Sequence, residues 1–150
     1  TIERQSQMVS SASNEGLKNV GAAIGITGDY LERAAALIDA GVSVLCLDVA
    51  HGHHVLMERA LKSIKDKYGD KLTLIAGNVA TPKGYVSLSE WGADAVRIGI
   101  GGGSICSTRV QTGHGVPTFE SVLTCGYEDG ATIIADGGIK SAGDIVCRNS

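Results

Sequence analysis

Residues 42–48 read VSVLCLD, and together with the two segments that follow they decide the fold class. Positions 42–47 are apolar nearly throughout, which is typical of a strand buried on both faces, and Asp48 lies just past the predicted strand end. A helix is predicted over 55–68, where apolar residues recur at helical spacing: Leu56, Ala60, Leu61 and Ile64. Residues 72–76 form the next predicted strand. The strand–helix–strand order indicates a parallel sheet.

The same alternation extends to both sides of this unit. Further strands are predicted over 20–24, 95–100 and 132–135, and further helices over 2–9, 29–40 and 82–91. Five strands with helices between them fit either a doubly wound α/β sheet or a (β/α) barrel. In both folds reactive groups gather where strands end. The polar and glycine residues of this chain are concentrated at those points: Asp48, Asn78, 101–106 and 136–138.

The whole of residues 1–150 is expected to be one domain. We find no linker, low-complexity run or second, regulatory domain in this sequence. Five predicted strands fall short of the eight in a closed (β/α) barrel, and both ends look cut, so we expect only part of a barrel. The coil 126–130 is too short for the helix that should precede the strand at Thr132. A deletion or an irregular connection is expected there.

Composition excludes several classes of function. The net charge of −3 and the pI near 5.7 argue against a surface for nucleic acid or an anionic membrane. No apolar stretch is long enough to span a bilayer, and no signal pattern is present. The four cysteines show no metal-binding spacing, and the three neighbouring histidines 51, 53 and 54 lack a carboxylate that would complete a zinc set. We expect reduced thiols and a cytoplasmic protein.

The densest motif is the stretch GIGGGSICSTR at residues 99–109. Three consecutive glycines after a strand free the backbone to turn its amides or carbonyls toward a ligand, and Ser104 could donate to a phosphate. Cys106 could be a nucleophile if its pKa is lowered, and Thr108 could hydrogen-bond a reacting water. The alternative is that Cys106 is a small buried hydrophobic residue. The stretch is neither a P-loop nor a dinucleotide-binding glycine fingerprint.

Five motifs in register resemble the inosine monophosphate dehydrogenases and their relatives, the guanosine monophosphate reductases. They are VGAAIG (20–25), DVAHGH (48–53), GNVAT (77–81), the loop 99–109 with TGHGVP (112–117), and IIADGGI (133–139). The resemblance runs from about Val20 to Val146. It implies a (β/α)8 TIM barrel that oxidises inosine monophosphate to xanthosine monophosphate with NAD, in guanine nucleotide biosynthesis.

The resemblance also implies a role for each motif. Cys106 matches the thiolate that adds to the purine C2 and forms a covalent thioimidate, and Thr108 matches the threonine that positions the hydrolytic water. On the substrate side, Ser104 and Gly138 match ligands of the phosphate. Asp136 matches the carboxylate that accepts the ribose hydroxyls.

The cofactor side is implied in the same way. Asp48, Asn78 and Arg97 match positions beside the nicotinamide of NAD. A monovalent cation, usually potassium, would bind the backbone carbonyls of Gly101, Gly103 and Cys106. The resemblance also implies a homotetramer that binds a purine nucleotide monophosphate, with no nucleic-acid or membrane partner.

Alternatives stay open at this stage. Asp48 and Asp136 could cap the helices that follow them, and Asn78 could be a turn residue. The family often has proline or serine where this chain has Gly102. The segments 134–139 and 50–52 favour a dehydrogenase over an NADPH-dependent guanosine monophosphate reductase. The flap that decides between them is absent from the sequence, so a truncated, non-catalytic nucleotide-binding subunit also remains.

Overall fold

The computed structural model describes residues 1–103, 113 and 115–149. Helices and strands alternate along the chain, with one short 3₁₀ helix, η1. In chain order the elements are α1 (Ile2–Asn14), β1 (Gly21–Ile24), α2 (Tyr30–Asp39), β2 (Val44–Asp48), α3 (Val55–Tyr68), η1 (Gly69–Lys71), β3 (Thr73–Val79), α4 (Pro82–Glu90), β4 (Ala95–Ile98), α6 (Thr118–Cys125), β5 (Thr132–Ala135) and α7 (Ala142–Asn149).

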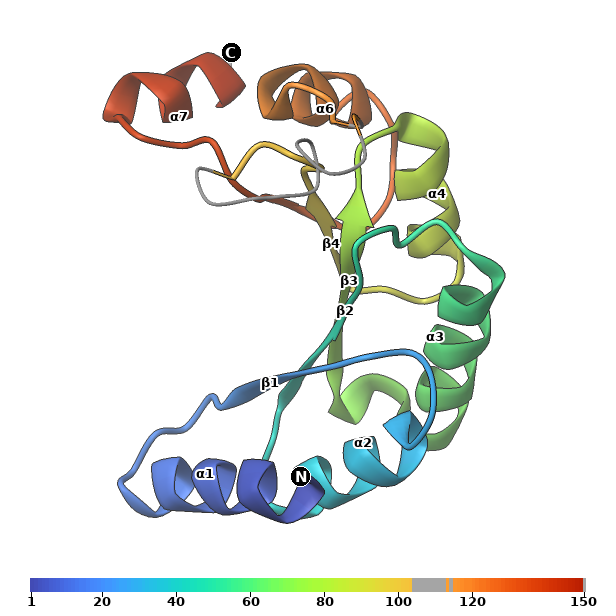
Figure 1. Cartoon of the computed structure of the whole chain (residues 1–150), viewed down its shortest axis with the longest axis vertical. Coiled ribbons are helices and arrows are strands. Elements are labelled where there is room, and N and C mark those ends of the chain that lie inside the picture. Colours follow the sequence, from blue (N-terminus) through green and yellow to red (C-terminus); the bar gives the residue numbers. More distant parts are fainter. Residues whose placement is uncertain (104–112, 114, 150) are drawn as a thin grey trace.

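The order of the strands distinguishes a barrel from a doubly wound sheet. Each strand pairs in parallel with the strand that follows it in the chain, in the order β1-β2-β3-β4-β5. A doubly wound sheet reverses its order at a switch point, whereas successive barrel strands stay adjacent and turn the same way. Helices α2, α3 and α4 all lie on the convex side of the curved sheet (Figure 1). The fold is α/β, an arc of a (β/α)8 barrel, as the sequence predicted.

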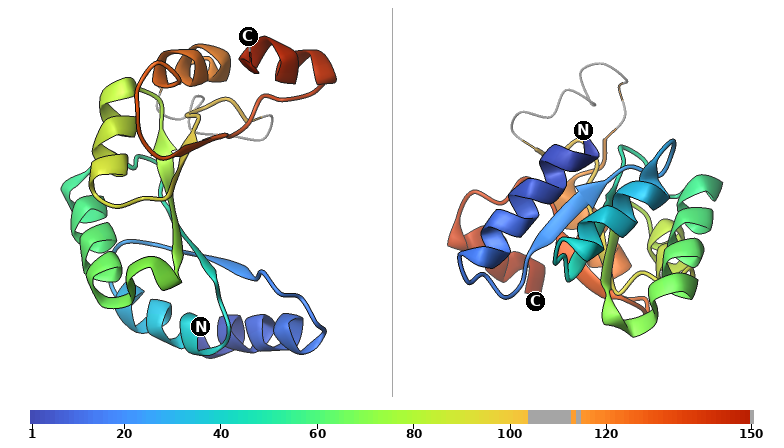
Figure 2. Two further views of the ribbon diagram at one scale, coloured as in Figure 1. Left: turned by 180° about the vertical axis from the view of Figure 1, so that it is seen from behind. Right: turned by 90° about the horizontal axis from the view of Figure 1, so that it is seen from below.

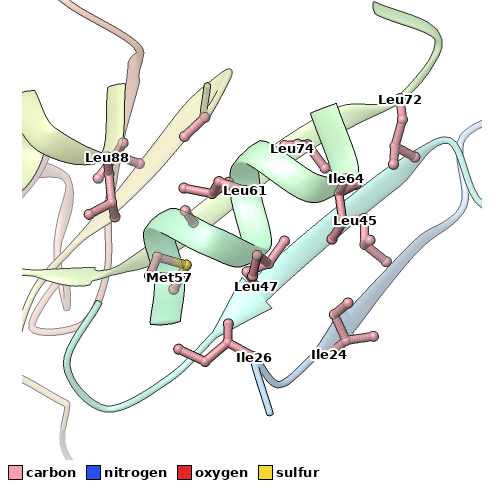
Figure 3. Close-up of a cluster of buried hydrophobic side chains, with 14 of the residues drawn as sticks. Ile24, Ile26, Leu45, Leu47, Met57, Leu61, Ile64, Leu72, Leu74 and Leu88 are labelled. Atoms are coloured by element: carbon pink, nitrogen blue, oxygen red, sulfur yellow. The ribbon is translucent and has the colours of Figure 1, made fainter. Parts of the chain in front are cut away.

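The helices and the sheet enclose the apolar core. Leu61 and Ile64 of α3 point toward the strands that carry Leu45, Leu47 and Leu74, and all five side chains are fully buried (Figure 3). Burial of a leucine or isoleucine side chain stabilises a fold by about 1.5–3 kcal/mol. The predicted helix over 55–68 is confirmed at both ends, and its fully buried residues, Met57, Ala60, Leu61 and Ile64, all fall on the face that this core requires.

The inner, concave face of the arc carries the alternate residues of each strand. Since side chains alternate along a strand, Cys46 and Asp48 lie on the face opposite Leu45 and Leu47. The arc opens away from the helices, and the two chain ends lie at opposite ends of it (Figure 2). The concave face therefore carries the strand residues that do not point into the apolar core between sheet and helices.

Three sequence predictions differ from the structure. The helix predicted over 2–9 extends to Asn14 as α1. The strand predicted over 72–76 is Thr73–Val79, so Gly77 and Asn78 belong to β3 and not to a loop. The expected irregular connection before Thr132 was wrong, because helix α6 precedes that strand. The buried face of α6 is formed by Thr118, Ser121, Val122 and Cys125. Half of these side chains are hydroxyls, so the helix lacks the apolar periodicity that would reveal it.

Candidate active site at the carboxyl ends of the strands

A guanidinium lies between two carboxylates where β2, β4 and β5 end. Arg97 of β4 places Nη1 3.1 Å from Oδ2 of Asp48 and Nη2 2.8 Å from Oδ2 of Asp136. Asp48 is the last residue of β2, and Asp136 follows β5 directly. The planar fork of arginine suits this arrangement, because its donors point in fixed and different directions. One positive charge thus holds two carboxylates at the same end of the sheet.

Gly77 explains how Arg97 reaches across the sheet. Asp48, Gly77 and Arg97 occupy one row on neighbouring strands. Strands lie about 4.8 Å apart, so roughly 10 Å separates the backbones that carry the acid and the arginine. A methyl group on Gly77 would lie 2.7 Å from Arg97 Cβ and 2.9 Å from Arg97 O. The missing side chain leaves the space through which the guanidinium crosses β3.

Asn78 completes the polar cluster. Its Nδ2 donates to Oδ2 of Asp136 at 2.5 Å and to the carbonyl of Gly99 at 2.8 Å. A register irregularity between Gly77 and Val79 interrupts the regular pairing of β3 with β4 at this residue. The loop after β2 is fastened to the same point, since Gly52 N donates to Asn78 O at 2.7 Å. Asn78 Oδ1 is buried and has no hydrogen-bond partner within the described part of the chain.

These contacts decide the alternatives left open by the sequence. Helix α3 is capped by His54, whose Nδ1 accepts from Leu56 N at 3.1 Å, and not by Asp48. Asp136 binds Arg97 and Asn78 and does not cap α7. Asn78 lies within a strand rather than a turn. All three polar side chains are therefore directed toward the cluster.

The charges of the cluster also act on each other. Burial lowers the pKa of the Arg97 guanidinium, but its hydrogen bond to Cys46 and the charges of Asp136 and Asp48 raise it, and the net shift of this pKa is upward. Burial raises the pKa of the Cys46 thiol, and Arg97 opposes that shift. Arg97 Nη1 lies 3.9 Å from Cys46 Sγ. Arg97 thus stays charged, and the thiol beside it stays neutral at pH 7.

Two hollows adjoin the cluster. A small one of about 200 Å³ has a mainly polar and glycine lining: Asp48, Val49, Ala50, Asn78, Arg97, Gly99, Ile100, Gly101 and Asp136. A larger one of about 670 Å³ shares Ala50 and Ile100 with it and is lined mainly by small and apolar residues, with His51, His53 and Thr81. Charged groups in the first and apolar walls in the second are the combination expected for a polar ligand that carries a flat ring.

The glycine loop begins beside these hollows. Side-chain carbons on Gly99 and Gly102 would collide with Asp136 O and Thr118 Oγ1 respectively, so the loop packs directly on β5 and α6. Thr118 is the neighbour that requires glycine at position 102. Thr118 Oγ1 is buried and has no hydrogen-bond partner in residues 1–103, 113 and 115–149.

The predicted site residues fall into three groups. Asp48, Asn78, Arg97 and Asp136 converge, although sequence reasoning divided them between the cofactor and the substrate. Gly101, Gly103 and Gly138 lie in the adjoining loops, and Gly137 packs against Gly102 and Gly103. Ser104, Cys106 and Thr108 lie outside the described residues.

Sequence reasoning missed Gly77, Cys46 and Thr118. Gly77 was missed because the predicted strand ended at residue 76, and only a glycine inside a strand indicates close approach of another group.

The described residues contain neither a metal-binding cluster nor a membrane-spanning helix. Among the described residues, no cluster of three or more histidine, cysteine or acidic side chains is arranged to hold a metal ion. His53 instead lies against Trp91, with ring centroids 5.8 Å apart. None of the helices that the structure describes has the length and apolar character needed to cross a membrane.

The arc of parallel strands and the polar cluster at their carboxyl ends define a (β/α)-barrel protein with a candidate ligand site at the usual face of that fold. The chain belongs to the IMP dehydrogenase / GMP reductase domain family, whose model matches residues 2–148.

Relatives support the same assignment. The chain is 48% identical over 149 residues to the inosine-5'-monophosphate dehydrogenase of Halalkalibacterium halodurans and 50% identical over 149 residues to that of Staphylococcus saprophyticus. Each match covers 97% of this chain and 30% of the relative. The GMP reductase of Leishmania major is 49% identical over 130 residues, which cover 84% of this chain and 26% of the relative. The chain thus spans about 30% of the length of the curated dehydrogenases it matches.

Proposed function

We propose that the protein oxidises inosine monophosphate to xanthosine monophosphate with NAD. The observation that carries the proposal is the cluster in which Arg97 joins Asp48 to Asp136 beside the glycine loop. A carboxylate pair held by one arginine offers acceptor oxygens to the hydroxyl groups of sugars. Family membership supplies the substrate class.

In the proposed reaction Cys106 is the nucleophile. Its thiolate adds to C2 of the purine, and a hydride then leaves C2, so that a thioimidate joins the purine to the sulfur. Water held by Thr108 adds to the same carbon and displaces the thiol, which releases xanthosine monophosphate. When bound, NAD accepts the hydride. Cys106 is regenerated and the balance of atoms closes.

The remaining site residues bind and orient the ligands. Asp136 would accept hydrogen bonds from the ribose hydroxyls of the substrate, and Ser104 with the Gly138 amide would bind its phosphate. Asp48, Asn78 and Arg97 would bind beside the nicotinamide. The residues present fit NAD, because the apolar hollow of about 670 Å³ adjoins this cluster and could receive a flat ring.

The loop also fits a monovalent cation. Backbone carbonyls of Gly101, Gly103 and Cys106 would hold potassium with uncharged oxygens. The buried hydroxyl of Thr118 beside Gly102, which has no partner among the described residues, adds one more oxygen near the loop. The cation would keep the loop backbone in one conformation.

The proposal extends to the setting of the protein. Residues 1–150 would form part of the catalytic barrel domain, with no regulatory domain within them. The protein would assemble as a homotetramer in the cytoplasm, as its family resemblance and cysteine spacing indicate.

A second candidate is reduction of guanosine monophosphate with NADPH. It is favoured by the 49% identity to a GMP reductase. The dehydrogenase is preferred because Ala135 precedes Asp136 and His51 follows Ala50, as in the dehydrogenases that this sequence resembles. The two reactions share the site. They differ in the direction of hydride transfer and in the group exchanged at C2, since the oxidation consumes water and the reduction releases the C2 amino group as ammonia.

The test is incubation with inosine monophosphate and NAD, followed by mass spectrometry and absorbance. We expect a purine adduct on Cys106, formation of NADH, and loss of both in Cys106→Ala. Cys125→Ala is the matched control, since that thiol is buried outside the site. An adduct without NADH would indicate a non-catalytic binding subunit. Oxidation of NADPH by guanosine monophosphate would indicate the reductase, and no adduct with either nucleotide would refute the proposal.

Substrate binding has a separate test. Asp136→Asn should weaken binding of inosine monophosphate about tenfold or more, because a charged acceptor is lost, with little change in stability. Isothermal titration calorimetry measures the change.

A further inference from the structure

We propose that Arg97 couples the two halves of the site, so that nucleotide bound at Asp136 raises the affinity of Asp48 for the dinucleotide. This inference rests on the proposed function. It assigns to Arg97 a positioning role that acts through two other residues, in addition to any direct contact with a ligand.

Each carboxylate meets Arg97 through a single oxygen, Asp48 as an ion pair and Asp136 as an ion pair that is also a hydrogen bond. Asp48 binds Arg97 through Oδ2, and Asp136 binds both Arg97 and Asn78 through Oδ2. Within the described residues neither Oδ1 atom has a hydrogen-bond or ion-pair partner. Each carboxylate therefore keeps one oxygen for a ligand while the other is held by the shared guanidinium.

Because these side chains are partly exposed, we expect positive coupling, in which one ligand raises the affinity for the other. Arg97, Asp48 and Asp136 have side-chain exposures of 26%, 47% and 36%, so the cluster is only partly immobilised by packing. A ligand that binds Asp136 fixes its carboxylate and, through Nη2, the plane of the guanidinium. Nη1 then fixes Asp48. Binding of the first ligand thus orders both carboxylates. The second ligand then loses less conformational entropy and binds more tightly.

Contacts of the Arg97 stem keep its guanidinium within reach of both acids. Its Cβ and carbonyl lie close over Gly77, and Cys46 Sγ lies 3.9 Å from Nη1. The stem is held while the terminal nitrogens face the two acids. A lysine would keep the charge, but its single ammonium group cannot hold two carboxylates in fixed directions.

The experiment measures coupling rather than turnover. In a Cys106→Ala background, which prevents the reaction, calorimetry gives the affinity for NAD with and without saturating inosine monophosphate. We expect the ratio of these affinities to fall about fivefold or more when Arg97→Lys is introduced. Asp48→Asn should lower the same ratio. Because linkage is reciprocal, NAD should change the affinity for inosine monophosphate by an equal factor.

The matched control is Lys65→Gln. Lys65 also bridges two carboxylates, those of Asp70 and Asp94, but it lies at the opposite end of the strands. The coupling ratio should be unchanged in this variant. Circular dichroism verifies that each variant is folded. If Arg97→Lys is not folded, Asp48→Asn tests the coupling in its place.

The outcomes separate this inference from the proposed function. If both ligands bind and the ratio is the same in Arg97→Lys, Asp48→Asn and Lys65→Gln, the coupling role of Arg97 is refuted and the proposed function stands. If the ratio in the Cys106→Ala background is one or less, the inference is equally overturned. If neither ligand binds, the proposed function fails and the inference fails with it.

Discussion

The two ends of the sheet carry the same pattern of charge and use it differently. At the amino ends of the strands, Lys65 lies 3.0 Å from Asp94 and 3.3 Å from Asp70. At the carboxyl ends, Arg97 lies between Asp48 and Asp136. Each cluster is one cation between two acids.

The difference lies in the remaining oxygens. Asp94 Oδ1 accepts from Lys65, and Oδ2 accepts from Leu74 N at 2.8 Å. Both carboxylate oxygens of Asp94 therefore already have partners within the fold. The carboxylates beside Arg97 each have one oxygen without a partner among the described residues, and both acids line the small hollow. A charge cluster whose acceptors bind backbone stabilises the chain, and one whose acceptors stay open can bind a ligand. In (β/α) barrels these two ends have the same division of roles.

The largest effect is expected from filling the space over β3. Gly77→Ala introduces a methyl group 2.7 Å from Arg97 Cβ and should destabilise the protein by about 3 kcal/mol, because backbone of β4 must shift. It should also abolish nucleotide binding. Urea unfolding and calorimetry measure the two effects. Gly25→Ala is the control, since nothing lies within 4 Å of its added carbon, and an equal loss of stability there would contradict the explanation.

A smaller effect is expected at the amino ends. Asp94→Asn weakens the acceptor of Leu74 N and removes the ion pair with Lys65, which should cost about 2 kcal/mol in the free energy of unfolding. Ligand affinity should be unchanged. Asp70→Asn should cost less than about 0.5 kcal/mol, because the Asp70 side chain is 99% exposed. Equal losses in the two variants would show that the backbone contact of Asp94 has no special weight.

The contact of α4 with the start of β5 tests the same end more gently. Tyr85 Oη donates to the carbonyl of Ala131 at 2.6 Å. Tyr85→Phe should lower the free energy of unfolding by about 1 kcal/mol and leave binding at the opposite end intact. Tyr127→Phe provides the comparison, because Tyr127 is 79% exposed. A change in nucleotide affinity in Tyr85→Phe would mean that the two ends are not independent.

A further prediction concerns the pH dependence of stability at Cys125 of helix α6. Burial raises the pKa of Cys125 from its ordinary value of 9.0 to about 11. Between pH 9 and 11 the unfolded thiol ionises while the folded thiol stays protonated, so the unfolded state binds fewer protons and stability falls as pH rises. The urea midpoint should fall more steeply over this range in the wild type than in Cys125→Ala. Parallel slopes would contradict the shift.

The spacing of apolar residues along the sequence predicted most of the helices and strands. The helix α3 and the strand β5 begin and end where the spacing of apolar residues predicted, because one face of each is decided by the core. Helix α6 was missed because Thr118 and Ser121 occupy half of its buried face. The end of β3 was misplaced because Gly77 and Asn78 are typical of turns.

By itself the sequence determined the alternation of strands and helices, the parallel sheet and the family, since these depend on short-range periodicity and on motifs that lie within single segments. Only the tertiary structure decided that Asp48 and Asp136 share one arginine. That contact depends on the register of four strands and on the empty space over Gly77, and both are set by packing between segments far apart in the chain.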